Sequence, residues 1–271
     1  MFLFYSGFGV MESIIKKRME YVNCMPKRRI FSTLMNFDVA VFVFFILNLL
    51  LDNEMRTTEI GLSLIGWDSI GNSNWYIFDI ILCYFITWLS FVVTRKEKQI
   101  NIKRALHFSL IPFTVSLIVL SLTKPDHWFD TLFAFVAGLF FAAYKEKIIH
   151  ILKKNYRKSL VSIIILYVLF HLQPDGIFCI WFNLESIAFA FMIVVLNMKI
   201  KVNNRILQWL GNHLFPLYIY QRLAMIALYE MDNGRFVRNF PEMYILICFG
   251  FTLLIAHLFH FWQISFAGEK T

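Results

Sequence analysis

The sequence predicts an all-α integral membrane protein, and three observations lead to this fold class. Hydrophobic residues make up 59% of the 271 residues, charged residues only 16%, and the mean hydropathy is +0.62. Soluble proteins contain about 45 to 50% apolar and about 25% charged residues. Apolar runs that approach the roughly 20 residues needed to cross a bilayer recur along the chain. Aromatic residues, which are typical of membrane interfaces and are included in the hydrophobic share, make up 18% of the chain.

We predict about nine transmembrane helices and treat 1–271 as one domain. The predicted spans are 1–15, 34–51, 75–93, 106–122, 128–144, 160–172, 177–197, 212–229 and 243–266. No soluble segment between them is long enough to fold alone. Any chemistry must therefore lie within the helix bundle or at its edges.

The connections between these spans predict the topology. Segments 16–29, 95–104, 145–158 and 199–205 are basic, whereas those between them are acidic, near neutral or mixed. Short cytoplasmic loops are enriched in Lys and Arg. We therefore expect a multi-pass protein of the cytoplasmic membrane, surrounded by lipid, with Met1 outside and the C-terminus in the cytoplasm. The net charge of +8 is then a topology signal, and no nucleic-acid partner is expected.

The first predicted span is unusual. Segment 1–15 covers only about 22 Å as a helix, and no basic residue precedes its apolar run as in a signal peptide. We expect a further helix upstream of Met1, and a short re-entrant or tilted segment is the alternative. The four cysteines have no CxxC or zinc-type spacing, so neither a metal site nor a disulfide is expected.

Two ionisable side chains lie at membrane depth and are the main candidates for chemistry. Arg222 lies about 15 Å into its helix, and Glu185 lies about 12 Å into the preceding antiparallel one. Such groups usually face a bundle interior or a wet cavity. They either neutralise one another as an ion pair, or Glu185 holds Arg222 against an anionic or carbonyl-bearing substrate.

Polar residues also follow one face of two predicted helices. The first stripe holds Tyr218, Gln221, Arg222 and Met225; the second holds Tyr76, Asp79, Cys83, Thr87 and Ser90. If both face inward, the bundle has a polar interior. Asp79 is close to the outer boundary, so it is either hydrated or functional. His107, His213, His257 and His260 lie near the cytoplasmic side, as interface residues or as a source of a general base.

Four stretches together resemble the membrane-bound acyltransferase-3 family. They are FLFYSGFGVMES, PKRRIFSTL, SNWYIFDIILCYF and LGNHLFPLYIYQRLAMI, and their order and spacing are similar to the second, third and later helices of that family. Members have about ten helices and move an acyl group, commonly acetyl from acetyl-CoA, to hydroxyls of polysaccharides, lipid-linked sugars or antibiotics. The resemblance implies a ten-helix bundle that here lacks its first helix.

The resemblance also implies roles for individual residues. Arg28 and Arg29 would face the phosphates of coenzyme A. Ser6, Trp75, Asp79 and Tyr84 would contact substrate, and Arg222, Glu185, Gln221 and Tyr218 would form the catalytic site. Gln221 stands where many members have histidine, and Asp79 replaces a glutamate that is often found nearby.

The family's first helix carries a basic residue and a histidine considered central to acyl transfer. Without that helix the expected general base is missing, so we expect this chain by itself to be impaired. Two other functions are compatible with the same residues. One is a small transporter or flippase in which Glu185 and Arg222 gate a pathway, and the other is a noncatalytic membrane partner.

Overall fold

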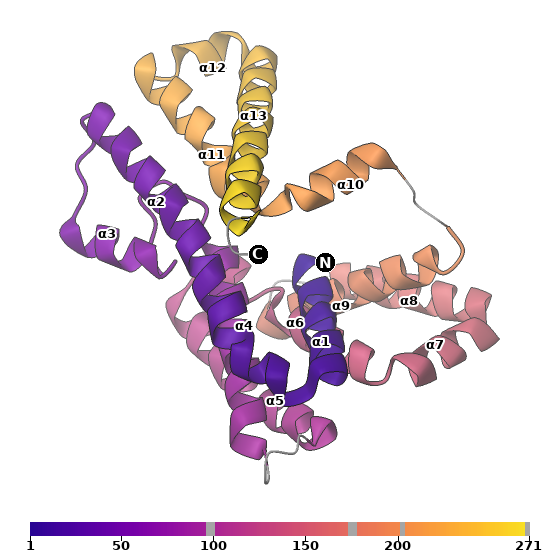
Figure 1. The fold of residues 1–271 in the computed structure, drawn as a ribbon. Helices are drawn as coiled ribbons and strands as arrows, with labels where there is room; N and C mark the ends of the chain where they lie inside the picture. The colour runs from indigo at the N-terminus through magenta and orange to yellow at the C-terminus, as the bar shows by residue number, and fades with distance from the viewer. Residues whose placement is uncertain (96–100, 173–177, 201–203, 269–271) are drawn as a thin grey trace. The chain divides into compact units, whose positions relative to one another are not determined.

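All regular structure in the described residues is helical. The computed structural model describes residues 1–95, 101–172, 178–200 and 204–268. Figure 1 shows the helices that these residues form. In chain order they are α1 (Phe2–Met25), η1 (Pro26–Phe31), α2 (Ser32–Leu50), α3 (Thr57–Leu64), α4 (Trp75–Thr94), α5 (Ile102–Thr123), η2 (Asp126–Trp128), α6 (Leu132–Ala143), α7 (Lys145–Lys154), α8 (Tyr156–His171), α9 (Phe178–Asn197), α10 (Arg205–Asn212), α11 (Leu214–Met231), α12 (Arg235–Asn239) and α13 (Pro241–Gly268).

Five helical stretches in the described part of the chain are long and apolar enough to cross a membrane. They are Phe2–Leu50, Trp75–Thr94, Ile102–Thr123, Ile180–Asn197 and Pro241–Phe259. The all-helical fold class is thus confirmed, but the count of nine spans is not. The first stretch contains two of the predicted spans. Three further predicted spans coincide with helices that are not among the five. Helices α6 and α8 are shorter than the five stretches, and α11 carries the polar side chains of Gln221 and Arg222 in its middle.

The prediction that 16–29 is a loop is wrong. Helix α1 continues to Met25 with one break at Arg18 (φ 50°, ψ −132°), and η1 follows directly. Tyr21, Val22 and Met25 are buried, so packing favours helix in a segment that its charges marked as a connection. Pro26 opens η1, where a missing N–H costs little. The predicted loop 145–158 is also helical except at Asn155. Helix α7 buries Leu152 while its lysines stay partly or fully exposed.

The chain forms two compact units. Unit 1 consists of Met1–Ser32 and Asp79–Val202, and unit 2 consists of Thr33–Phe78 and Asn203–Thr271. Each unit is described by itself below. The prediction of one domain over 1–271 stays a prediction.

Unit 1 is built around the packing of α1 on α6, which lie side by side in Figure 1. A Cβ atom on Gly7 would overlap the carbonyl oxygen of Phe135, and one on Gly138 would overlap that of Phe4. Small residues of this kind let two helix backbones approach closely in a membrane. The fully buried Phe4 ring packs on those of Phe141 and Phe191, each 5.7 Å away between centroids.

Helices α1 and α6 run in the same direction. Met1 lines a pocket with Thr131, just before α6, and at the other end Lys145 Nζ donates to Glu12 Oε1 at 3.0 Å. This is the relative direction that the alternating charge of the connections predicts. Helices α8 and α9 form a second packed pair, and α9 also contacts α6.

In unit 2, α11 packs on α13 and a polar loop is fixed to α2. Asn48 of α2 donates one hydrogen bond to the carbonyl of Ile70 (2.7 Å) and another to that of Phe44 (2.8 Å). Gly71 has φ +108°, a conformation that side chains rarely adopt, and it lies against Ile226 of α11. The loop that leads into α4 is therefore rigidly held.

Candidate functional site

The candidate site residues fall in both units. Unit 1 holds Ser6, Arg28, Arg29, Asp79, Tyr84 and Glu185, and unit 2 holds Trp75, Tyr218, Gln221 and Arg222. Because Glu185 and Arg222 belong to different units, their pairing stays a prediction. Within each unit, however, several of the predicted residues lie together.

Arg29 is the centre of the first group. Its Nε donates to the hydroxyl of Tyr21 at 3.0 Å, and its guanidinium lies over the ring of Tyr84, 6.0 Å from the centroid. The hydroxyl of Tyr84 also interacts with Ser6. Ser6, Arg29 and Tyr84, from three different parts of the sequence, thus meet at one place in unit 1. Neighbouring Arg28 is exposed.

The polar face of α4 is buried. Asp79, Cys83, Thr87 and Ser90 are all at most 1% exposed, so these four residues face the inside of unit 1. Thr87 and Ser90 satisfy their hydroxyls by donating to the carbonyls of Cys83 (2.8 Å) and Ile86 (2.7 Å) on their own helix. Both carboxylate oxygens of Asp79 are buried without a hydrogen-bond partner in the described residues. A hydrated surface position is therefore wrong for Asp79.

An aromatic group marks the start of α4 in unit 2. The rings of Trp75 and Tyr76 pack edge-on against that of Tyr218, at 6.2 and 5.3 Å. The hydroxyl of Tyr218 accepts a hydrogen bond from the backbone N–H of Tyr76 at 3.3 Å, and Gln221 Nε2 donates to Ser73 Oγ at 3.2 Å. Predicted site residues about 140 positions apart in sequence thus lie in contact.

Arg222 lies one position beyond this group on α11. Its side chain is exposed and makes no hydrogen bond or ion pair among the residues whose structure is described. Met225, which follows on the same face, is 42% exposed. In contrast to the face of α4, the end of this stripe is at the surface of its unit.

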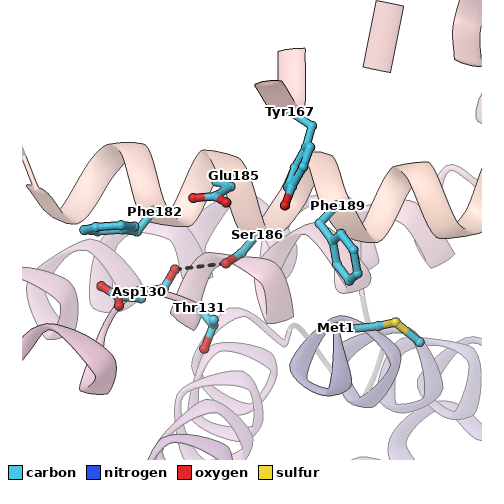
Figure 2. A pocket seen from close by; sticks show the side chains of 8 residues that line it. All are labelled: Met1, Asp130, Thr131, Tyr167, Phe182, Glu185, Ser186 and Phe189. Atoms are coloured by element: carbon cyan, nitrogen blue, oxygen red, sulfur yellow. Dashed lines mark hydrogen bonds between the residues drawn. The ribbon is translucent and has the colours of Figure 1, made fainter. Parts of the chain in front are cut away.

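A pocket of about 350 Å³ opens in unit 1 between α8, α9 and the turn before α6 (Figure 2). Its lining residues are Met1, Asp130, Thr131, Tyr167, Phe182, Glu185, Ser186 and Phe189. Three rings, two carboxyl groups and three hydroxyls therefore face one space, with no Lys or Arg side chain among the lining residues. A volume of this size is typical of small-molecule sites.

Asn183 of α9 fixes the turn that carries Asp130 and Thr131. Its Nδ2 donates to the carbonyl of Phe129 at 2.7 Å, and its Oδ1 accepts from the N–H of Phe133 at 2.8 Å. Ser186, one turn further along α9, donates to the carbonyl of Asp130 at 3.3 Å, as Figure 2 shows. The position of Asp130 in the pocket is therefore set by side chains of α9.

Asp130 lies in the turn before α6, outside the five candidate spans, although the sequence placed it inside one. Burial raises its pKa to about 6, and the carboxyl groups of Asp126 and Glu185 add to the rise. The carboxyl of Asp130 is therefore protonated over part of the range below neutral pH. A neutral carboxyl can donate as well as accept a hydrogen bond.

Glu185 meets a histidine that the sequence did not single out. Nδ1 of His171, at the end of α8, lies 2.9 Å from Oε1 of Glu185 on α9. The ring of His171 also stacks on that of Tyr167, with 6.0 Å between centroids and 15° between planes. His171 ends an apolar run a few residues before the next predicted span. Since helices joined by a short connection are usually antiparallel neighbours, that position in the sequence was the available signal.

No group of three or more His, Cys, Asp or Glu side chains that could hold a metal ion occurs in the described residues. No family model, curated protein or solved structure matches the chain.

Proposed function

We propose that this chain is a membrane-bound O-acyltransferase. It would move an acyl group, most simply acetyl from acetyl-CoA, to a hydroxyl of a cell-envelope polysaccharide or a lipid-linked sugar. In this proposal the chain contributes nine spans in the cytoplasmic membrane, with its C-terminus in the cytoplasm.

The observation that carries the proposal is the group around Arg29. The resemblance assigns Arg29 to coenzyme A and Ser6 and Tyr84 to substrate, and these residues contact one another within unit 1. Arg29 is held by Tyr21, so its guanidinium keeps its orientation before a ligand arrives. An ordered guanidinium suits a phosphate because it can donate two parallel hydrogen bonds. Arg28 beside it is exposed and can take a second phosphate oxygen.

Acyl transfer also needs positive charge near the oxygen of the tetrahedral intermediate. We assign this role to Arg222, with Gln221 and Tyr218 on the same helix and Glu185 as its predicted partner. The Trp75 and Tyr218 rings would then border the path of the acceptor.

A transporter or flippase is the second candidate, and the buried carboxyl of Asp79 favours it. Unpaired ionisable groups at membrane depth mark ion or proton pathways in many transporters. Such a protein would move its substrate without consuming acyl-CoA.

The test is transfer of labelled acetyl from acetyl-CoA to envelope glycan in membranes that contain this chain, beside a version extended upstream if the gene encodes one. We expect transfer that the double variant Arg28→Ala/Arg29→Ala abolishes. Lys17→Ala is the control, because it removes a nearby exposed charge on the other side of the break at Arg18. Absence of transfer from both versions, combined with substrate uptake that needs Asp79, would replace the proposal by the transporter.

A further inference from the structure

Acyl transfer to a hydroxyl needs a general base, and the structure brings a histidine and a carboxylate together in unit 1. His171 and Glu185 form a histidine–carboxylate pair, with Nδ1 and Oε1 2.9 Å apart. A base oriented by a second group is the arrangement that activates hydroxyl groups in acyl transfer.

The hydrogen bond determines which nitrogen of His171 is basic. An ionised carboxylate can only accept hydrogen bonds, so Nδ1 of His171 carries the proton that points at Glu185. Nε2 is then left with a lone pair. Stacking on Tyr167, which lines the pocket, fixes the plane of the imidazole ring. Glu185 thus sets the tautomer and Tyr167 sets the orientation.

The pocket beside this pair has the chemistry of a site for a polyhydroxy ligand. The carboxyl groups of Asp130 and Glu185 can accept hydrogen bonds from ligand hydroxyls, and Thr131 and Ser186 add two hydroxyls. The rings of Tyr167, Phe182 and Phe189 offer apolar faces to the C–H surface of a sugar. Figure 2 shows polar and aromatic groups intermixed around this space.

We propose that this pocket receives the hydroxyl-bearing acceptor and that His171 is the general base, with Glu185 as its positioning residue. This inference rests on the proposed acyltransferase function. The acceptor O–H bond breaks and its proton passes to Nε2 of His171, while the acceptor oxygen bonds to the acyl carbon. The carbon–sulfur bond of the thioester then breaks, and the thiolate leaving group takes the proton back from His171.

The first test compares His171→Gln and Glu185→Gln with His150→Gln in membranes containing the full chain. His150 is an exposed histidine of α7. We expect His171→Gln to lower kcat by about 10²-fold or more, with little change in the KM for acetyl-CoA. Glu185→Gln should lower kcat less, and Glu185→Asp should restore part of the rate that Glu185→Gln loses. Equal kcat values for His171→Gln and His150→Gln would overturn the base assignment while leaving the proposed function intact.

A second measurement does not depend on turnover. Diethyl pyrocarbonate modifies accessible neutral histidines, and mass spectrometry gives the rate at each one. We expect a soluble oligosaccharide cut from envelope glycan to slow modification of His171 but not of His150. Equal rates with and without the oligosaccharide would overturn the acceptor site, and this holds whether or not transfer is observed. If the sugar protects His171 but the wild-type chain transfers no acetyl, the proposed function fails and the base assignment fails with it.

Discussion

Gly7 and Gly138 mark the same crossing of α1 and α6, because each lies against the backbone of the other helix. Gly7 meets Phe135 and Leu139, and Gly138 meets Phe4 and Phe8. Gly7, which follows Ser6 in the stretch FLFYSGFGVMES, therefore has a packing role that does not depend on the function of Ser6.

Replacing either glycine by alanine should destabilise unit 1. The added methyl group would overlap a backbone carbonyl, which no side-chain rotation can relieve. We expect a loss of about 1 to 3 kcal/mol for Gly7→Ala or Gly138→Ala, seen as a lower midpoint of thermal denaturation in detergent. Gly9→Ala is the matched control, because nothing lies within 4 Å of its added Cβ. An equally lowered midpoint for Gly9→Ala would mean that the loss does not come from this helix crossing.

Arg29 and Arg28 should differ in how they respond to substitution by lysine. Arg29 bonds Tyr21 and covers Tyr84, and lysine cannot reproduce a planar contact of this kind. We expect Arg29→Lys to raise the KM for acetyl-CoA by about tenfold or more, in line with about 1.5 to 3 kcal/mol for a hydrogen bond to a charged group. Arg28→Lys should change it by less than about threefold, since Arg28 is exposed and needs only its charge. The same KM for both lysine variants would contradict an ordered role for Arg29.

Asp130 should make stability depend on pH between about 4 and 6. Its pKa rises from the ordinary 3.8 to about 6 in the fold, so the folded protein holds a proton that the unfolded chain has released in this interval. Stability therefore falls as pH rises through this window and is insensitive to Asp130 above it. The thermal midpoint of the wild type should decrease over the window relative to that of Asp130→Asn.

The exposed Asp52→Asn serves as the control for that comparison. It should show the same pH trend as the wild type. An identical trend in Asp130→Asn would show that Asp130 is not the group responsible.

Asn183 should be needed for the pocket turn. Removing its amide in Asn183→Ala leaves the N–H of Phe133 and the carbonyl of Phe129 without these bonds. We expect a loss of about 1 to 3 kcal/mol, measured as thermal midpoint, and faster protease cleavage between α5 and α6. Ser186→Ala, which loses only a 3.3 Å bond, should cost much less. Equal losses of stability for the two variants would contradict the role of Asn183 in fixing this turn.

Substitution of Asp79 should have opposite effects on stability and on activity if this residue serves function. Burying a carboxyl that has no hydrogen-bond partner, as Asp79 has none in the described residues, costs free energy, so Asp79→Leu should raise the thermal midpoint. If Asp79 serves transport or transfer, the same variant should lose that activity. A lower midpoint would mean that Asp79 has a stabilising partner.

Helices and buried faces could be predicted from the sequence because their signals are local. Apolar runs and the spacing of Asp79, Cys83, Thr87 and Ser90 depend only on neighbours within a few turns. The described residues contain five helical stretches that are long and apolar enough to cross a membrane, and these four polar residues are buried. The loop assigned to 16–29 failed because buried contacts of Tyr21 and Met25 outweighed the local charge signal.

The sequence by itself determined the helical membrane class, the polar face of α4 and the residue types available for chemistry, since these follow from composition and from a period of 3.6 residues. Only the tertiary structure decided which residues are in contact. Arg29 contacts Tyr21 and Tyr84. Two glycines allow α6 to pack closely on α1, and Glu185 forms a hydrogen bond with His171. Such contacts join residues on different helices or different turns, and their geometry depends on helix crossings and rotations that no local pattern encodes.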